Sequence, residues 1–215
     1  MENSDRWQEE VLFFSGDKCF ADQLEHIDRA QTSVDLESYI FMGDEIGRQF
    51  EDALLKAHHR GAKVRMLVDG FGSFEWINTR YAEVIKQGLN VRVYHPILLI
   101  NQLLQNDFTW DSLAKVNERG TSLNRRNHRK SFIVDGQMAW VGSMNVTKVH
   151  SRHLLSDKGW RDTAVPVKGI VEPLQRGFDV IWKQGGRANE WKVWKPEFLK
   201  SIKEIHSALV GSNYT

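Results

Sequence analysis

The sequence predicts an α/β fold, with a mixed, largely parallel sheet flanked by helices on both faces. The first observation is a strand–helix–strand succession over residues 34–68, because two parallel strands need a crossover connection of helical length. The second is a pair of strands joined by Asp135-Gly136, a dipeptide typical of a tight hairpin turn. A chain of 215 residues is long enough to bury one such core and to carry an appendage.

The first predicted elements lie between residues 34 and 61. From Val34 to Phe41 apolar residues alternate with polar ones, which predicts a half-buried strand. Asp44 then opens a helix, because apolar residues recur at helical spacing from Ile46 to Arg60. Gly61 ends this helix as a C-terminal cap.

The next elements continue the alternation of strands and helices. Residues 63–68 are predicted as the second strand, 81–87 as a helix and 90–94 as a third strand. After the second strand, Asp69-Gly70-Phe71-Gly72-Ser73 contains two glycines, which predicts a tight turn at the carboxyl edge of the sheet. No Lys-Ser or Lys-Thr pair follows, so this turn does not fit a nucleotide phosphate loop.

Residues 95–123 interrupt this pattern, because such a stretch is long for a connection within a compact domain. It contains the apolar run from Pro96 to Ile100, with Leu103 and Leu104 behind it. Two interpretations remain open. The run is either a buried helix that covers the sheet edge, or an apolar surface that docks on a bilayer or binds acyl chains.

The second half of the chain contains two paired strands, a further strand and a helix. They are predicted at residues 129–134, 138–141, 160–167 and 170–182. We expect one domain over residues 1–185, followed by a C-terminal helical tail over residues 186–215.

Composition and charge exclude several classes of protein. Lys and Arg number 29 against 28 Asp and Glu, so the net charge of +1 creates no overall attraction to nucleic acid. Cys19 is the only cysteine, which excludes an internal disulfide and fits a small buried residue. With neither a signal-peptide pattern nor an apolar run of ~18 residues, we expect a protein that is cytoplasmic or peripheral to the inner face of a membrane.

The segment from Asn124 to Asn145 contains the residues that carry chemistry. His128 and Lys130 are two apart on a predicted strand, so both side chains leave the same face and can reach one small group. Lys130 suits a phosphate oxygen, and a histidine with an ordinary pKa near ~6.5 can act as a neutral nucleophile. We therefore expect a site for an anionic phosphate ester.

Ser143 and Asn145 repeat the two-residue spacing and follow Gly142, which leaves room for a substrate beside the backbone. Both side chains can donate hydrogen bonds to the same phosphate and stabilise the charge of a five-coordinate phosphorus transition state. This chemistry requires no metal and no other cofactor.

The pattern His-x-Lys, four residues, Asp, six residues, Gly-Ser-x-Asn identifies the chain as resembling the phospholipase D superfamily, with all six fixed positions present. Flanking segments resemble the bacterial cardiolipin synthase branch over roughly residues 10–185. These segments are Leu36 to Phe41, Arg60-Gly61, Val68 to Gly70 with Gly72-Ser73, Tyr94 to Pro96, Asn124 to Asn127, and Trp160 to Thr163. The resemblance implies a phospholipid substrate whose phosphatidyl group passes to an alcohol, or to water in a hydrolase.

Carried over position by position, the resemblance implies that His128 forms a phosphohistidine intermediate or acts as its acid–base counterpart. Lys130 and Asn145 become phosphate ligands, and Ser143 a supporting donor. The acidic residue that orients the histidine in family members matches Asp162 in this chain.

Four further positions are assigned less directly. Asp135 belongs to the motif and is grouped with the catalytic residues, although a structural role suits it better. Gly142 and Arg126 are assigned to substrate binding, and Glu37 to support of the site.

One departure concerns the number of motifs, because most family members contain two and this chain contains one. No other histidine has a lysine two residues later, and we expect them to be surface or capping residues. Among them His153 is the one worth testing. Two copies meeting about a twofold axis can rebuild a site with two histidines, so we expect a homodimer, or else a second chain that carries the motif.

Two alternatives to a lipid enzyme remain open. A nuclease or other phosphodiesterase is favoured by the single motif and by four nearby arginines, although nucleic acid is the less favoured partner. These arginines are Arg119, Arg125, Arg126 and Arg129. A subunit of a split two-chain enzyme is the second alternative.

Peripheral contact with a membrane also remains open, since tryptophan favours the headgroup region. The candidates are Trp76, Trp110, Trp191 and Trp194.

Overall fold

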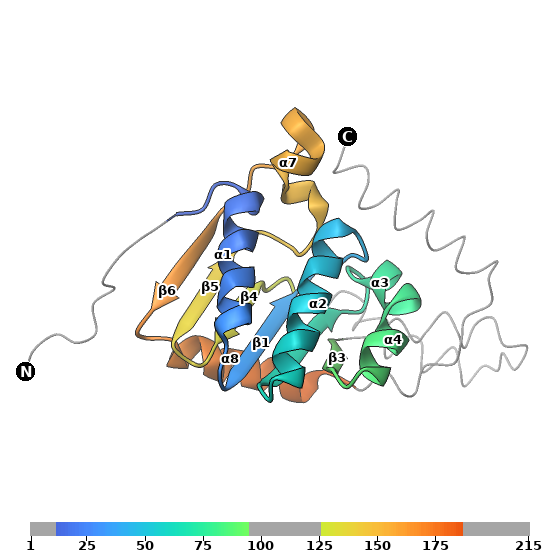
Figure 1. Ribbon diagram of the computed structural model, residues 1–215, viewed down its shortest axis with the longest axis vertical. Coiled ribbons are helices and arrows are strands. Elements are labelled where there is room, and N and C mark those ends of the chain that lie inside the picture. The colour runs from blue at the N-terminus through green and yellow to red at the C-terminus, as the bar shows by residue number, and fades with distance from the viewer. Residues whose placement is uncertain (1–11, 95–125, 187–215) are drawn as a thin grey trace, which may run out of the picture. The chain divides into compact units, whose positions relative to one another are not determined.

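The computed structural model describes residues 12–94 and 126–186 (Figure 1). In chain order its elements are α1 (Gly16–Arg29), β1 (Ser33–Ser38), α2 (Glu45–His59), β2 (Lys63–Asp69), α3 (Phe74–Thr79), α4 (Tyr81–Lys86), β3 (Asn90–Tyr94), β4 (Ser131–Val134), β5 (Met138–Gly142), η1 (Lys148–His150), α7 (Arg152–Leu155), η2 (Ser156–Lys158), β6 (Ala164–Lys168) and α8 (Glu172–Gln184). The apolar run from Pro96 to Ile100 and the tail from residue 187 lie outside the described residues, as do Trp110, Trp191 and Trp194.

The six strands form one mixed sheet in the order β3-β2-β1-β4-β5-β6. Strands β3, β2 and β1 pair in parallel, whereas β1, β4, β5 and β6 pair antiparallel. The expected crossover from β1 through α2 to β2 is present. The predicted mixed α/β fold is therefore confirmed.

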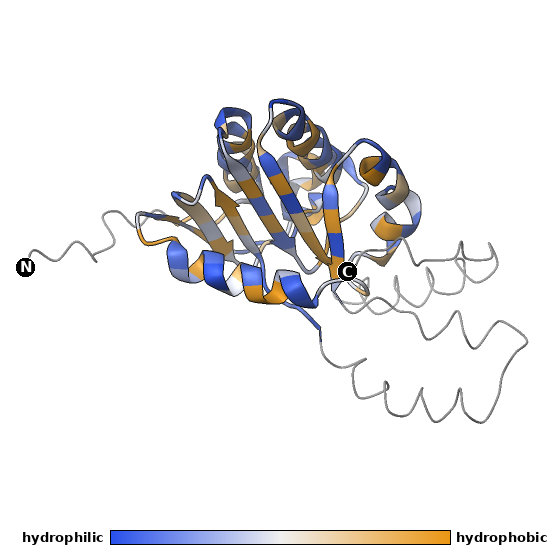
Figure 2. Ribbon diagram, turned by 90° about the horizontal axis from the view of Figure 1, so that it is seen from below, coloured by the Kyte–Doolittle hydropathy of each residue, from blue (hydrophilic) through white to orange (hydrophobic). Residues whose placement is uncertain are grey.

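Helices cover both faces of this sheet. The view in Figure 2 is edge-on, with α8 against one face and α1 to α4 against the other. Phe20 of α1 packs on Phe50 of α2, and Phe50 packs on Phe132 of β4, which lies against Trp140 of β5. On the opposite face, Phe178 and Trp182 of α8 pack on apolar strand residues. Those strand residues are Leu67, Ile133, Ala139 and Val167.

The prediction that β1 is half-buried was wrong, because α8 covers the face that alternation assigned to solvent. Asp35 and Glu37 point to that face and are each only 2% exposed. A buried carboxylate is tolerated when it is paired. Asp35 accepts two hydrogen bonds of 2.6 Å from the guanidinium of Arg65 and one of 2.7 Å from Gln175 of α8.

Several other local expectations also changed. Helices α1 and α3 were not predicted, although in α1 Cys19, Phe20 and Ile27 fall on one buried face. Cys19 is buried, as expected, and its burial raises the pKa of its thiol to about 12. Trp76 of α3 is also fully buried and donates a 2.6 Å hydrogen bond to Glu51, so this tryptophan is part of the core and no membrane anchor.

The hairpin between β4 and β5 turns at Asp135-Gly136, as predicted, and both residues have positive φ angles of 52° and 64°. The Asp135 carboxylate reaches across to the chain entering β1. It accepts hydrogen bonds from the backbone N–H groups of Gln31, Thr32 and Ser33 and from the Thr32 hydroxyl. Burial raises the pKa of Asp135, but these donors outweigh it and hold the pKa below its ordinary value.

Replacing Asp135 with Asn is expected to destabilise the fold by about 1–3 kcal/mol at pH 7, because backbone donors lose their charged acceptor. The lowered pKa gives this contribution a definite pH dependence. It is fully present above the ordinary carboxyl pKa and is lost as the pH falls through the folded-state pKa. Urea denaturation at pH 7 and near pH 3 should therefore show a difference between D135N and wild type that shrinks in acid. Asp157→Asn, on exposed η2, is the matched control, and an equal effect of both substitutions would contradict the assignment.

Candidate active site

The candidate site lies at one edge of the sheet, where the carboxyl ends of β1 and β2 meet the start of β4. Because β4 runs antiparallel to β1, its first residue, Ser131, pairs with Glu37 near the end of β1. Ser131 also pairs with Val141 of β5, and Gly142 pairs with Ala164, the first residue of β6. The segments before β4, after β5 and before β6 are thereby brought to the same edge.

Asn127 holds the residue that follows it, His128, at this edge. Its backbone N–H donates a 3.1 Å hydrogen bond to Asp69 at the end of β2, and its side-chain amide donates one of 2.7 Å to Glu37. Ser131 donates a third, of 2.7 Å, to the other oxygen of Glu37. Two buried carboxylates from neighbouring parallel strands therefore fix the segment that carries His128 and Lys130, and one of them is Glu37.

Asp69 also organises the turn that follows β2. Its carboxylate accepts hydrogen bonds from the N–H groups of Phe71 and Gly72. A Cβ atom on Gly72 would lie 2.2 Å from the carbonyl oxygen of Tyr39, so only glycine fits this close approach. Burial raises the pKa of Asp69, and the N–H donors and Arg126 offset part of this rise. The turn was predicted from its two glycines, but Asp69 was not among the predicted site residues.

Tyr39 joins the two motif residues His128 and Lys130 by direct contact. The rings of Tyr39 and His128 lie 3.9 Å apart between centroids, with 38° between their planes. The Lys130 ammonium lies 5.3 Å from the Tyr39 ring centroid and donates a 2.5 Å hydrogen bond to the carbonyl oxygen of His128. Tyr39 was predicted to lie on a strand, within a segment that resembles the cardiolipin synthase branch, but its contact with the site was not predicted.

The surroundings of His128 favour its neutral form. Burial lowers the pKa of the imidazole, the positive charge of Lys130 lowers it further, and Asp69 offsets part of this effect. The pKa of Lys130 is lowered by burial and raised in part by Asp162 and Asp69. A neutral imidazole next to an ammonium is what attack on an anionic phosphate ester requires.

Asn145 has one orientation of its amide group that fits its contacts. Its Oδ1 accepts a 3.0 Å hydrogen bond from the backbone N–H of Ile40, which can only donate. Backbone bonds between Ile40 and Val146 and between Val146 and Met42 hold the two segments together. The Nδ2 group of Asn145 is therefore the one that can donate to a bound oxyanion.

Ser143 and Asp162 contact one another. The Ser143 hydroxyl donates to Oδ1 of Asp162, and the Ser143 N–H donates a 2.9 Å bond to the carbonyl of Thr163. The hydroxyl proton of Ser143 is thus directed to a carboxylate. The structure thus pairs Ser143 with Asp162, and a hydrogen bond from Ser143 to a bound phosphate stays a prediction.

The histidine that approaches the motif is His150, not His153. His150 is 1% exposed, and its Nδ1 atom lies 3.1 Å from Oδ2 of Asp162. His153 lies exposed on α7, where its backbone N–H donates to Asp17. The expectation that His150 is a surface or capping residue was wrong, because periodicity cannot report a contact with a residue twelve positions away.

Three further assigned residues can be placed in the structure. A Cβ atom on Gly142 would lie 2.2 Å from the carbonyl oxygen of Thr163, so the approach of β6 requires this glycine, and its role in substrate binding stays a prediction. Asp135 lies at the far end of β4 from His128, so the structure does not bring it to the site. Arg126 does reach the site, where its guanidinium lies 3.9 Å from Asp69 and over the Phe71 ring.

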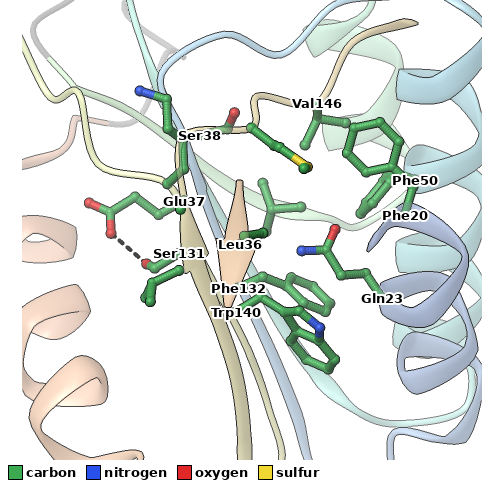
Figure 3. A pocket seen from close by; sticks show the side chains of 15 residues that line it. Phe20, Gln23, Leu36, Glu37, Ser38, Phe50, Ser131, Phe132, Trp140 and Val146 are labelled. Carbon is green, nitrogen blue, oxygen red and sulfur yellow. Dashed lines mark hydrogen bonds between the residues drawn. The ribbon is translucent and has the colours of Figure 1, made fainter. Parts of the chain in front are cut away.

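A small cavity lies beside the site, between the sheet and helices α1 and α2 (Figure 3). Its lining combines Lys130 and Gly142 with apolar side chains, among them Phe20, Phe50 and Trp140. The volume is about 30 Å³, room for one or two water molecules and far too little for an acyl chain. Ser131 and Glu37 also line the cavity, and the dashed line in Figure 3 marks the hydrogen bond that the Ser131 hydroxyl donates to Glu37.

The fold is that of the phospholipase D class. The solved structure of Nuc, a phospholipase D family member from Salmonella typhimurium, superposes with a TM-score of 0.55 at 21% identity. The match covers 83% of this chain and 96% of that one. At this level of identity the similarity shows the fold alone.

Sequence comparison then identifies the family. Residues 23–155 match the family model described as cardiolipin synthase, PLD-like domain, and the chain belongs to this family. It is 30% identical over 202 residues to cardiolipin synthase 1 of Bacillus anthracis, which covers 92% of this chain. It is 33% identical over 186 residues to cardiolipin synthase B of Salmonella typhimurium, covering 84% of this chain. The chain spans only 36% and 40% of the lengths of these two relatives.

Two further properties hold for the described residues, 12–94 and 126–186. None of their helices combines the length and apolar character needed to cross a bilayer. They also contain no group of three or more His, Cys, Asp or Glu side chains arranged to hold a metal ion.

Replacing Lys130 with Met is expected to raise the pKa of His128, because the substitution removes a nearby positive charge that disfavours imidazolium. The neutral fraction of His128 at a given pH should fall accordingly. An NMR titration of the imidazole in wild type and K130M measures this change directly. Lys168→Met, at the opposite end of the sheet, is the matched control, and an unchanged or lower His128 pKa in K130M would contradict the interpretation.

Proposed function

We propose that this chain is a phospholipase D-type enzyme that moves a phosphatidyl group from a phospholipid to an alcohol, or to water. One observation carries the proposal: a neutral His128 lies at the same sheet edge as two directed donors, the Lys130 ammonium and Asn145 Nδ2. Membership of the cardiolipin synthase family supports a phospholipid as the substrate and a lipid headgroup alcohol as the acceptor.

The first step is attack on phosphorus by an imidazole nitrogen of His128. The new P–N bond forms as the P–O bond to the leaving alcohol breaks, and the leaving oxygen takes a proton from a second acid. Lys130 and Asn145 hold the nonbridging oxygens, whose charge rises in the five-coordinate transition state. The hydrogen bonds of Asn127 to Asp69 and Glu37 support this step, because they hold the segment that carries His128 in place as the bond forms.

The second step returns the phosphatidyl group to an oxygen nucleophile. The acceptor hydroxyl gives its proton to the same second group, attacks phosphorus, and displaces His128 as the P–N bond breaks. Transferase and hydrolase differ only in whether this acceptor is an alcohol or water.

The second acid and base is a second histidine, which we propose comes from a second copy of the chain. Within the described residues, His150 cannot take this role because it is 1% exposed and both ring nitrogens face protein groups. An isologous pair would place two His128 rings on opposite sides of one phosphorus atom. A different chain that carries the motif is the alternative source.

A nuclease is the second candidate function, and the described arginines weigh against it. Arg129 directs its guanidinium to buried Glu37, at 3.5 Å, and to the carbonyl of Gly177, at 3.2 Å. Arg126 faces Asp69. Charges compensated in this way attract a polyphosphate backbone less strongly. Arg119 and Arg125 lie outside the described residues.

Turnover of phosphatidylglycerol in mixed micelles tests the proposal. His128→Ala should lower the rate by about 10²–10⁴-fold because the nucleophile is lost. Asn145→Ala should lower it by about 10²–10³-fold because one oxyanion donor is lost. Asn90→Ala, exposed at the start of β3, is the matched control.

The products and a second substrate separate the candidate functions. Cardiolipin or phosphatidic acid should appear with wild type and disappear with H128A. Wild-type turnover of DNA or of a generic diester, without any turnover of lipid, would replace the lipid enzyme with the nuclease.

Mixing wild type with H128A tests whether two copies share one site. If each reaction needs two His128 residues, equal amounts of both chains, exchanged to equilibrium, should leave about a quarter of the wild-type activity, because only one pair in four is intact. If each chain works alone, the same mixture should keep about half of the wild-type activity. An inert wild-type monomer that gains activity with another chain carrying the motif would establish the split enzyme instead.

A further inference from the structure

His150 is the last residue of η1, five positions after Asn145, and is not part of the motif. Its ring is 1% exposed and packs edge-on against Trp160, with 6.3 Å between ring centroids. Its backbone leaves no space toward α1, because a Cβ atom on Gly16 would lie 2.3 Å from the carbonyl oxygen of His150. The position of this imidazole is therefore fixed by packing on two sides.

The contacts of His150 assign its tautomer. The backbone N–H of Asn145 donates a 3.1 Å hydrogen bond to Nε2, and a backbone N–H can only donate. Nε2 must therefore carry the lone pair, so the hydrogen of the neutral ring is on Nδ1. That atom lies 3.1 Å from Oδ2 of Asp162, a close polar contact that does not have hydrogen-bond geometry.

Charges around the ring are consistent with this neutral form. Burial lowers the pKa of His150, Asp162 raises it, Lys130 lowers it and Asp44 raises it, and the outcome is a pKa below the ordinary value. Asp44 reaches this region as the N-cap of α2, where its second oxygen accepts hydrogen bonds from Thr147 and Lys148.

Through these two contacts one ring connects three residues of the motif. Asn145 is bound through its backbone, while its side chain is held by Ile40. Asp162 accepts the hydroxyl hydrogen of Ser143 on its other oxygen. The negative charge of Asp162 raises the pKa of Lys130 and so offsets part of the effect of burial. Moving the imidazole would displace the amide and the carboxylate together.

We propose that His150 is a positioning residue for phosphodiester transfer, which holds the Asn145 backbone through the hydrogen bond to Nε2 and the Asp162 carboxylate through its close contact with Nδ1. It acts through these two residues and does not contact the phosphate. This role rests on the proposed function, and it adds to that function a residue that belongs to no part of the motif.

Two substitutions at His150 separate positioning from packing. Phe keeps the aromatic volume and loses both polar contacts, whereas Gln retains one acceptor and one donor. H150F should lower kcat by about 10–100-fold, since small displacements of catalytic groups have effects of this size, and should change KM less. H150Q should recover most of the loss, and His153→Gln on exposed α7 should have no effect.

The pH profile provides a readout that packing alone would not change. Because Phe has no polar atom to replace Nδ1 beside Asp162, the acid limb of the kcat profile should move in H150F and return in H150Q. Thermal unfolding of all three proteins reports any loss of stability separately. A wild-type kcat in H150F, or equal defects in H150F and H150Q with an unmoved acid limb, would overturn the proposal.

Binding of inorganic phosphate, followed by 31P NMR, separates this inference from the proposed function. Wild type should bind phosphate about tenfold more tightly than H150F if the ring orients Asn145, because tenfold corresponds to about 1.4 kcal/mol, the size of one net hydrogen bond. This comparison does not depend on the lipid assay. Wild type without any turnover would refute the proposed function alone, whereas equal phosphate affinity in wild type and H150F would refute the role of His150.

Discussion

Two buried carboxylates hold the rest of the site in place. Glu37 and Asp69 end neighbouring parallel strands with side chains that have no exposed surface. Burying an ionised carboxylate is costly unless hydrogen-bond donors surround it. Here the donors are the groups that need positioning: Asn127 and Ser131 on either side of His128 and Lys130. If Asn127 or Ser131 moved, a buried carboxylate would lose a hydrogen-bond donor. The need to satisfy Glu37 and Asp69 therefore also holds the segment 127–131 in place.

The change from parallel to antiparallel pairing determines where these groups meet. If β4 ran parallel to β1, its first residue would lie at the opposite edge from the ends of β1 and β2. The antiparallel pairing of β1 with β4, and of β4 with β5, instead brings the residues before Ser131 and after Gly142 to the carboxyl edge. The turn after β2 then supports the exit of β1, through Ser73, which bonds to both Tyr39 and Phe41.

Local patterns in the sequence were sufficient for β1, α2, β2 and the Asp135-Gly136 turn, since periodicity and turn residues act over a few positions. The spacing of His128 and Lys130 likewise predicted that these two residues lie together. What escaped prediction depends on contacts between distant segments. The burial of Glu37 follows from the position of α8, and the partners of His150 come from the exit of β5 and the segment before β6. Helix α8 is far from Glu37 in the sequence, whereas Asn145, His150 and Asp162 are close in the sequence but fall at no recognisable period.

The spacing of the motif has a consequence for insertions and deletions. Lys130 and Asp135 enclose β4, one at the catalytic edge and the other at the opposite edge, where its carboxylate is bound by the chain entering β1. The four residues between them are the whole of β4, so their number sets the distance between the two edges of the sheet. Adding or removing one residue would exchange the faces of Phe132 and Ile133 and detach one end of the strand from its partners. Over evolutionary time this part of the chain can change its side chains but not its length.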